Sequence, residues 1–132
     1  MTKHSKRLIL IDDNPHIIES IELTLNSHNI EINGFTNGNE AIKFIKDTDF
    51  SGVIICDAQM PQIDGWDTIL ELSKLGIHDR IIINMLTGVA EPPDKSNACA
   101  GHIFDYLKKP YKGKELIELV ERSFSNLLEE SA

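Results

Sequence analysis

Five polar residues have the types and the spacing that phosphoryl transfer requires: Asp12, Asp13, Asp57, Thr87 and Lys109. One carboxylate can act as the nucleophile, and two others can hold a divalent cation such as Mg²⁺. A hydroxyl can bond a phosphoryl oxygen, and an ammonium group can pair with its charge. One aspartate at a strand end is usually a turn or capping residue. Five such groups together exceed what turn chemistry requires.

Short apolar segments lead into these polar residues and predict the strands that position them. Residues 53–56 are apolar and rich in β-branched side chains, and Asp57 follows them directly. Residues 8–11 have the same character and end in Asp12 and Asp13. Such runs are typical of strands buried on both faces of a parallel sheet, whose carboxyl ends bind ligands. Three carboxylates at one edge would repel each other, so we expect a divalent metal there.

The chain alternates between strand and helix patterns along its whole length. We expect strands over residues 8–11, 30–35, 53–56, 80–86 and 103–107. We expect five helices. One begins at Asn14-Pro15, one spans residues 40–46, and one ends at Gly76. The last two cover residues 91–100 and 112–128, and 91–100 is the poorest helix former. Asn37-Gly38 reads as a turn. The prediction is an α/β fold, a doubly wound five-stranded parallel sheet with helices on both faces. One domain should span residues 7–128, with 129–132 as a frayed tail.

Composition narrows the function classes. The 132 residues fit one domain, and 41% are hydrophobic, which favours a globular chain over a disordered one. The net charge of −8 argues against a general nucleic-acid binder. No apolar run could span a membrane, and residues 1–7 are too short and polar for a signal peptide, so we expect a cytoplasmic protein. Cys56 and Cys99 lack metal-binding spacing, and Cys56 is expected to be a small buried hydrophobe.

From residue 7 to about 128 the sequence resembles a response-regulator receiver domain of two-component signalling, in size the stand-alone chemotaxis type. The matching residues are Asp12-Asp13, Asp57 within D-A-Q-M-P-Q-I-D-G, Thr87 within M-L-T-G, Tyr106, and Lys109-Pro110. The resemblance implies the flavodoxin-like receiver fold.

The resemblance also implies roles for the acidic residues and the lysine. Asp57 would accept a phosphoryl group from a histidine kinase or a small phosphodonor. Asp13, Asp57 and the backbone carbonyl of Gln59 would bind Mg²⁺ directly, and Asp12 would act through a water. Lys109 would bridge to the phosphoryl group, and its bond to the following proline is often cis in this family.

A switch and its partners follow from the same resemblance. Thr87 would move to bond the phosphoryl group, and Tyr106 would turn inward and change the surface that a partner reads. The partners would be a sensor histidine kinase or phosphotransfer protein and a downstream protein target, with no direct contact to nucleic acid or membrane. The domain would be no enzyme beyond catalysing its own phosphorylation and dephosphorylation.

Alternatives stay open for the whole chain and for single residues. The domain could be an inert receiver-like interaction scaffold. An aspartyl-phosphate phosphatase is disfavoured, because it needs a second acid where Gln59 stands. Tyr106 could be an ordinary half-buried strand aromatic, and Phe104 could compete for the same space. Trp66 is expected to pack at a helix start, and residues 91–102 depart most from the family pattern.

Overall fold

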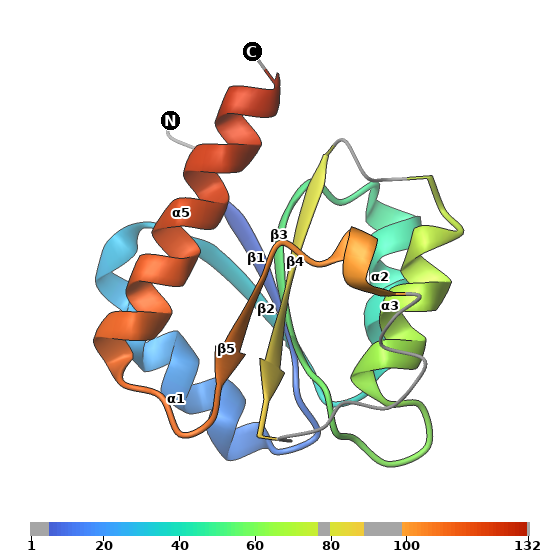
Figure 1. The fold of residues 1–132 in the computed structure, drawn as a ribbon, viewed down its shortest axis with the longest axis horizontal. Coiled ribbons are helices and arrows are strands. Elements are labelled where there is room, and N and C mark those ends of the chain that lie inside the picture. The colour runs from blue at the N-terminus through green and yellow to red at the C-terminus, as the bar shows by residue number, and fades with distance from the viewer. Residues whose placement is uncertain (1–5, 77–79, 89–98, 132) are drawn as a thin grey trace.

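Five strands form one parallel sheet in the order β2-β1-β3-β4-β5 (Figure 1). The computed structural model describes residues 6–76, 80–88 and 99–131. The strands are β1 (Arg7–Ile11), β2 (Glu31–Phe35), β3 (Gly52–Asp57), β4 (Ile81–Thr87) and β5 (Asp105–Lys108). The helices are α1 (Pro15–Leu25), α2 (Gly38–Thr48), α3 (Gly65–Ser73) and α5 (Gly113–Ser131), with short 3-10 turns η1 (Asn26–His28) and η2 (Ala100–His102). The predicted parallel α/β sheet is therefore confirmed.

Helices cover both faces of the sheet, α1 and α5 on one and α2 and α3 on the other (Figure 1). Successive side chains of a strand point to opposite faces, so each central strand supplies both cores. In β1, Ile9 packs toward α2 and α3, while Leu8 packs toward α1 and α5. Every residue of β3 is buried, as the unbroken apolar run predicts. Strand β2 lies at one edge and is more exposed.

Asparagine and aspartate side chains start three of the helices. Asn14 Oδ1 accepts a hydrogen bond from the backbone N–H of His16, and Pro15 follows as the first helical residue, as predicted. Asn37 Oδ1 accepts from the backbone N–H of Glu40 at 2.8 Å. The predicted turn at Asn37-Gly38 is therefore wrong: Asn37 is the N-cap and α2 begins at Gly38, because capping satisfies the first free N–H groups.

The last third of the chain differs from the prediction at two boundaries. Strand β5 begins at Asp105 rather than at residue 103, because the turn η2 precedes it and the chain enters the sheet two residues later than predicted. Helix α5 continues to Ser131, beyond the predicted helix end at residue 128. The fraying expected of residues 129–132 stays a prediction. Glutamates at 129 and 130 favour helix continuation. Most of the segment 91–102, residues 91–98, lies outside the described residues.

The carboxyl ends of the strands share one end of the molecule. The start of β1 and the end of α5 both lie at the opposite end (Figure 1). Within the described part of the chain, no helix is both long enough and apolar enough to cross a membrane.

Candidate functional site

Three carboxylates meet at the carboxyl ends of β1 and β3. Ile11 is paired with Cys56 in the parallel ladder, so Asp12 follows one strand where Asp57 ends the other. One carboxylate oxygen from each of Asp12, Asp13 and Asp57 lies within 4.8 Å of the others. Asp12 and Asp57 are buried, while Asp13 is exposed to solvent. The predicted acidic cluster is thus confirmed.

Asp12 brings a buried and only partly hydrogen-bonded carboxylate to this cluster. Its Oδ1 accepts a hydrogen bond from the backbone N–H of Asn14 at 2.9 Å. Its Oδ2 is buried and has no hydrogen-bond partner among the described residues. Burial raises the pKa of Asp12, and the charges of Asp57 and Asp13 raise it further, against the lowering by the Asn14 bond and Lys109. An unpartnered buried oxygen among three carboxylates fits a hard divalent cation such as Mg²⁺.

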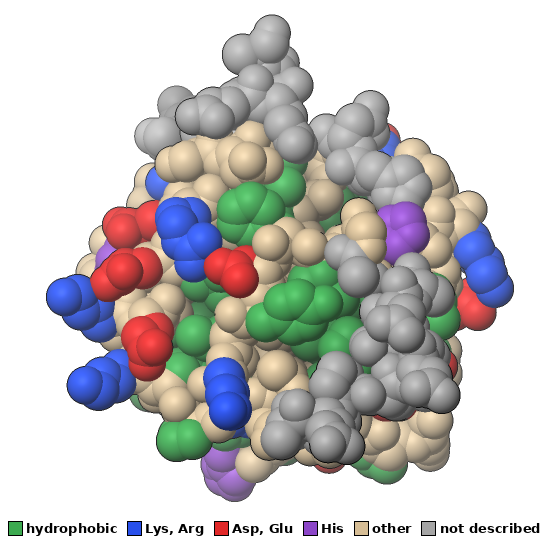
Figure 2. Space-filling model, viewed as in Figure 1, with side chains coloured by type: hydrophobic (Ala, Val, Ile, Leu, Met, Phe, Trp, Pro, Cys, Tyr) green, Lys and Arg blue, Asp and Glu red, His purple; other side chains and the backbone are tan. Residues whose placement is uncertain are grey.

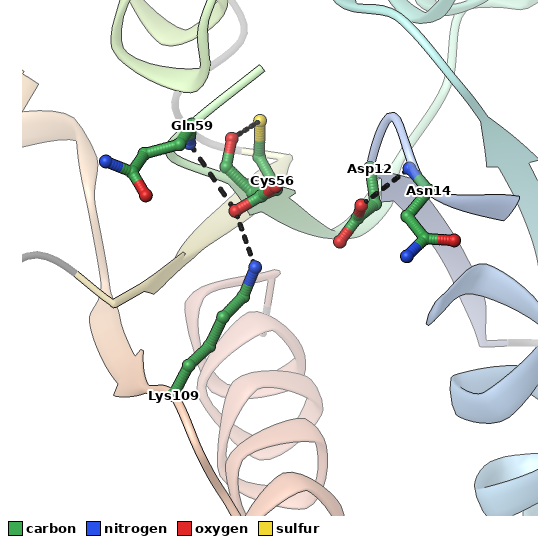
Figure 3. A network of polar contacts seen from close by, with 6 residues as sticks. Asp12, Asn14, Cys56, Gln59 and Lys109 are labelled. Carbon is green, nitrogen blue, oxygen red and sulfur yellow. Dashed lines mark hydrogen bonds and ion pairs between the residues drawn. The ribbon is translucent and has the colours of Figure 1, made fainter. Parts of the chain in front are cut away.

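Lys109 supplies the one described salt bridge to the cluster. Its Nζ donates to Oδ1 of Asp57 at 2.9 Å, and Figure 3 shows this side chain extending toward the acidic residues. Burial lowers the pKa of Lys109, but the hydrogen bond and charge of Asp57, with the charge of Asp12, raise it above the ordinary value overall. The Lys109–Pro110 bond is cis, as the resemblance implied. The ammonium group therefore stays charged beside the Asp57 carboxylate.

The loop after β3 is closed tightly against the end of that strand. The backbone N–H of Ala58 donates to Leu86 O at 2.9 Å, and that of Gly65 donates to Ala58 O at 3.0 Å. A Cβ atom on Gly65 would lie 2.2 Å from the carbonyl oxygen of Asp57, so only glycine fits there. The backbone N–H of Gln59 points at Asp57 Oδ1 at 3.4 Å. The metal-binding role of the Gln59 carbonyl stays a prediction.

Thr87 and Tyr106 lie on the neighbouring strands β4 and β5, and β4 pairs with β3, the strand that ends in Asp57. Thr87 ends β4, and its carbonyl accepts the backbone N–H of Lys109 at 2.8 Å. Tyr106 is 44% exposed, so its ring is turned outward in this structure. The ring centroid lies 6.4 Å from that of Trp66, which is buried at the start of α3 as predicted. Phe104 is exposed as well.

Both cysteines are buried, and one residue near Lys109 was missed by the sequence analysis. Cys56 is fully buried, and burial raises the pKa of its thiol, which confirms it as a core residue. Cys99 is buried too. Tyr111 was missed. Burial raises the pKa of its half-buried phenol, Lys109 lowers that pKa, and the charges of Asp12 and Asp57 raise it. Its place two residues after Lys109 was the available signal.

The family model of the response regulator receiver domain matches residues 8–121. The C4-dicarboxylate transport transcriptional regulatory protein DctD of Pseudomonas aeruginosa is 26% identical over 89% of this chain and 25% of its own length. The cell cycle response regulator CtrA of Brucella ovis is 32% identical over 84% of this chain and 47% of its own. The chain thus spans between a quarter and a half of these relatives.

Solved structures agree with the family match. The crystal structure of a CheY-like response regulator receiver domain protein from Methanospirillum hungatei JF-1 has a TM-score of 0.87 and 28% identity, and it covers 96% of this chain and 99% of that one. The chemotaxis protein CheY4 of Vibrio cholerae has the same fold, with a TM-score of 0.78, 24% identity, and coverage of 89% of this chain and 98% of that one.

Proposed function

The chain belongs to the response regulator receiver domain family of two-component signalling, and we propose that Asp57 is its phospho-acceptor. The observation that carries this proposal is the placement of the Asp57 carboxylate. It is buried at the end of a central strand, 2.9 Å from Lys109 Nζ, and it shares a cluster with two further carboxylates. A nucleophile, a fixed positive charge and a cation-binding set then face the same reacting group.

In the proposed transfer, a carboxylate oxygen of Asp57 attacks the phosphorus atom of the donor. The new O–P bond forms while the P–N bond of a phosphohistidine, or the P–O bond of acetyl phosphate, breaks. The imidazole or acetate leaves with the electron pair of that bond. In hydrolysis, water attacks the phosphorus, Asp57 leaves as a carboxylate, and the proton passes to solvent.

The surrounding residues hold charge at fixed positions. Lys109 pairs with the acceptor before transfer and with the phosphoryl oxygens after it. Asp13, Asp57 and the Gln59 carbonyl would hold Mg²⁺, with Asp12 acting through a water. When bound, Mg²⁺ offsets the charge of the carboxylates and of the transferring group. The domain is thereby proposed to catalyse only its own phosphorylation and dephosphorylation.

The output is proposed to run through Thr87 and Tyr106. A phosphoryl group adds about two negative charges and three acceptor oxygens, which attract a nearby hydroxyl. Movement of Thr87 toward the group would vacate space for the outward-turned ring of Tyr106. Receiver domains interact with histidine kinases or phosphotransfer proteins and with downstream targets. For this chain we propose a histidine kinase or phosphotransfer protein as donor and a protein target as reader.

Acetyl phosphate with Mg²⁺ tests the acceptor directly, with intact mass as the readout. The wild type should gain one labile phosphoryl group, and Asp57→Asn should gain none. Asp67→Asn is the matched control, because it removes a carboxylate in the first turn of α3 outside the acidic cluster. A chelator should abolish the gain. Equal uptake by Asp57→Asn would reassign the acceptor, and no uptake by the wild type would favour the inert scaffold.

A further inference from the structure

An aromatic contact joins α3 to β5. Trp66, the second residue of α3, is 2% exposed, and its ring centroid lies 6.4 Å from that of Tyr106 at an interplanar angle of 41°. The thiol of Cys99 donates to the carbonyl oxygen of Trp66 at 3.3 Å. In the view of Figure 2, hydrophobic side chains gather near the middle of this face, beside the charged residues over α5. The two rings form a tilted pair of the favourable kind.

The two partners differ in how firmly they are held. Trp66 follows Gly65, whose N–H donates to Ala58 O and which lies too close to the Asp57 carbonyl to accept a Cβ atom. The Asp64 carboxylate caps the same turn of α3 by accepting from the N–H of Asp67 at 2.9 Å. The indole is therefore buried and fixed relative to the loop that follows Asp57. The Tyr106 ring, by contrast, is 44% exposed and has solvent on one side.

We propose that Trp66 is a positioning residue that holds Tyr106 turned outward and opposes its inward movement. The inference rests on the proposed function, since it assigns a physical restraint to the proposed switch. A ligand that favours the inward position must break the contact between the two rings. Removing the contact then tightens the binding of that ligand, because binding and conformation are linked. From the strength of such ring pairs we expect about a two- to tenfold effect.

Beryllofluoride with Mg²⁺, a mimic of the phosphoryl group, measures this restraint by titration calorimetry. Trp66→Leu keeps an apolar side chain at the buried position and should bind the mimic about two- to tenfold more tightly than wild type. A variant that was merely destabilised would not bind more tightly. Unchanged or weaker binding by folded Trp66→Leu would overturn the proposal.

Trp66 is the only tryptophan of the chain, so its emission supplies a second test. In the wild type, emission should change when beryllofluoride binds. Tyr106→Ala should already show altered emission without the mimic and should lose most of the further change. Phe104→Ala is the matched control: it removes another exposed aromatic near β5 that has no described ring contact with Trp66, and it should behave as wild type.

The outcomes separate the restraint from the proposed function. If acetyl phosphate modifies the wild type but Tyr106→Ala shows the full emission response, the restraint is refuted and the acceptor chemistry stands. The restraint is refuted equally if Tyr106→Ala leaves the resting emission of Trp66 unchanged. If the wild type takes up neither acetyl phosphate nor beryllofluoride, the proposed function fails and the restraint on a switch fails with it.

Discussion

Replacing Asp12 by asparagine should stabilise the metal-free domain. The carboxylate is buried, and one oxygen lacks a hydrogen-bond partner among the described residues. An asparagine would keep an acceptor for the N–H of Asn14. It would also place an N–H donor where the unpartnered oxygen lies, on a side chain that shares the cluster with Asp57. The substitution therefore removes a repulsive charge and adds a donor at the same position.

The magnitude follows from the separation of the carboxylates. Two like charges 4.8 Å apart, the upper limit of the separation in this cluster, repel by about 3.5 kcal/mol at an effective dielectric constant of ~20. Lys109 offsets part of this repulsion, because its ammonium group pairs with Asp57. We therefore expect Asp12→Asn to raise the unfolding free energy by about 1–2 kcal/mol in the presence of a chelator. Asp13→Asn should raise the unfolding free energy by less, because Asp13 is exposed and its charge is screened by solvent.

Urea unfolding with chelator and with excess Mg²⁺ checks the argument. At about 100 times its dissociation constant, the cation adds about 2.7 kcal/mol to the wild type. Mg²⁺ should stabilise Asp12→Asn by less, so the difference in unfolding free energy between the variant and the wild type should narrow or reverse. The pKa of Asp12 is raised in the folded state, so its contribution to wild-type stability falls as pH rises from 3.8 through the folded pKa. The stability of Asp12→Asn should lack this fall with rising pH. A variant that is less stable than wild type in chelator would refute the reasoning.

Three further substitutions test backbone strain, close packing and a buried hydrogen bond by urea unfolding. Gln62 has a φ of 66°, so Gln62→Gly should raise the unfolding free energy by about 1 kcal/mol, and a decrease would show that the side chain contributes more than the backbone strain costs. Gly65→Ala should cost about 1–3 kcal/mol or more and slow phosphorylation, whereas Gly101→Ala, with open space around its Cβ position, should change little. Ser123→Ala should cost about 1–3 kcal/mol, because it leaves the buried amide of Asn84 without its 2.9 Å partner. Adding Asn84→Leu should recover part of that loss, and strict additivity would argue against the coupling.

The sheet and the acidic cluster could be predicted because their signals are local in the sequence. An apolar run that ends in Asp57, and another that ends in Asp12 and Asp13, place the strand and the functional group in one stretch. Parallel pairing then brings the strand ends together without further information. The same reasoning placed Lys109 after β5, where it reaches Asp57.

The misses depend on contacts between distant parts of the chain. The sequence does not show that a turn at Ala100–His102 delays β5 to Asp105. The ring contact between Tyr106 and Trp66 joins residues forty positions apart, and no local pattern in the sequence reports it. The cap at Asn37 was missed for a different reason: asparagine before glycine favours a turn and a helix start alike, and only the bond to Glu40 decides between them.

The direction of the parallel strands has a consequence for how such a domain is used in evolution. The start of β1 and the end of α5 lie at the end of the molecule opposite the acidic cluster (Figure 1). A second domain joined at either point would leave the approach to Asp57 clear. Gene fusion could thus attach different output modules without rebuilding the chemistry. This chain spans 25% of the length of DctD and 47% of that of CtrA, so both relatives contain additional sequence.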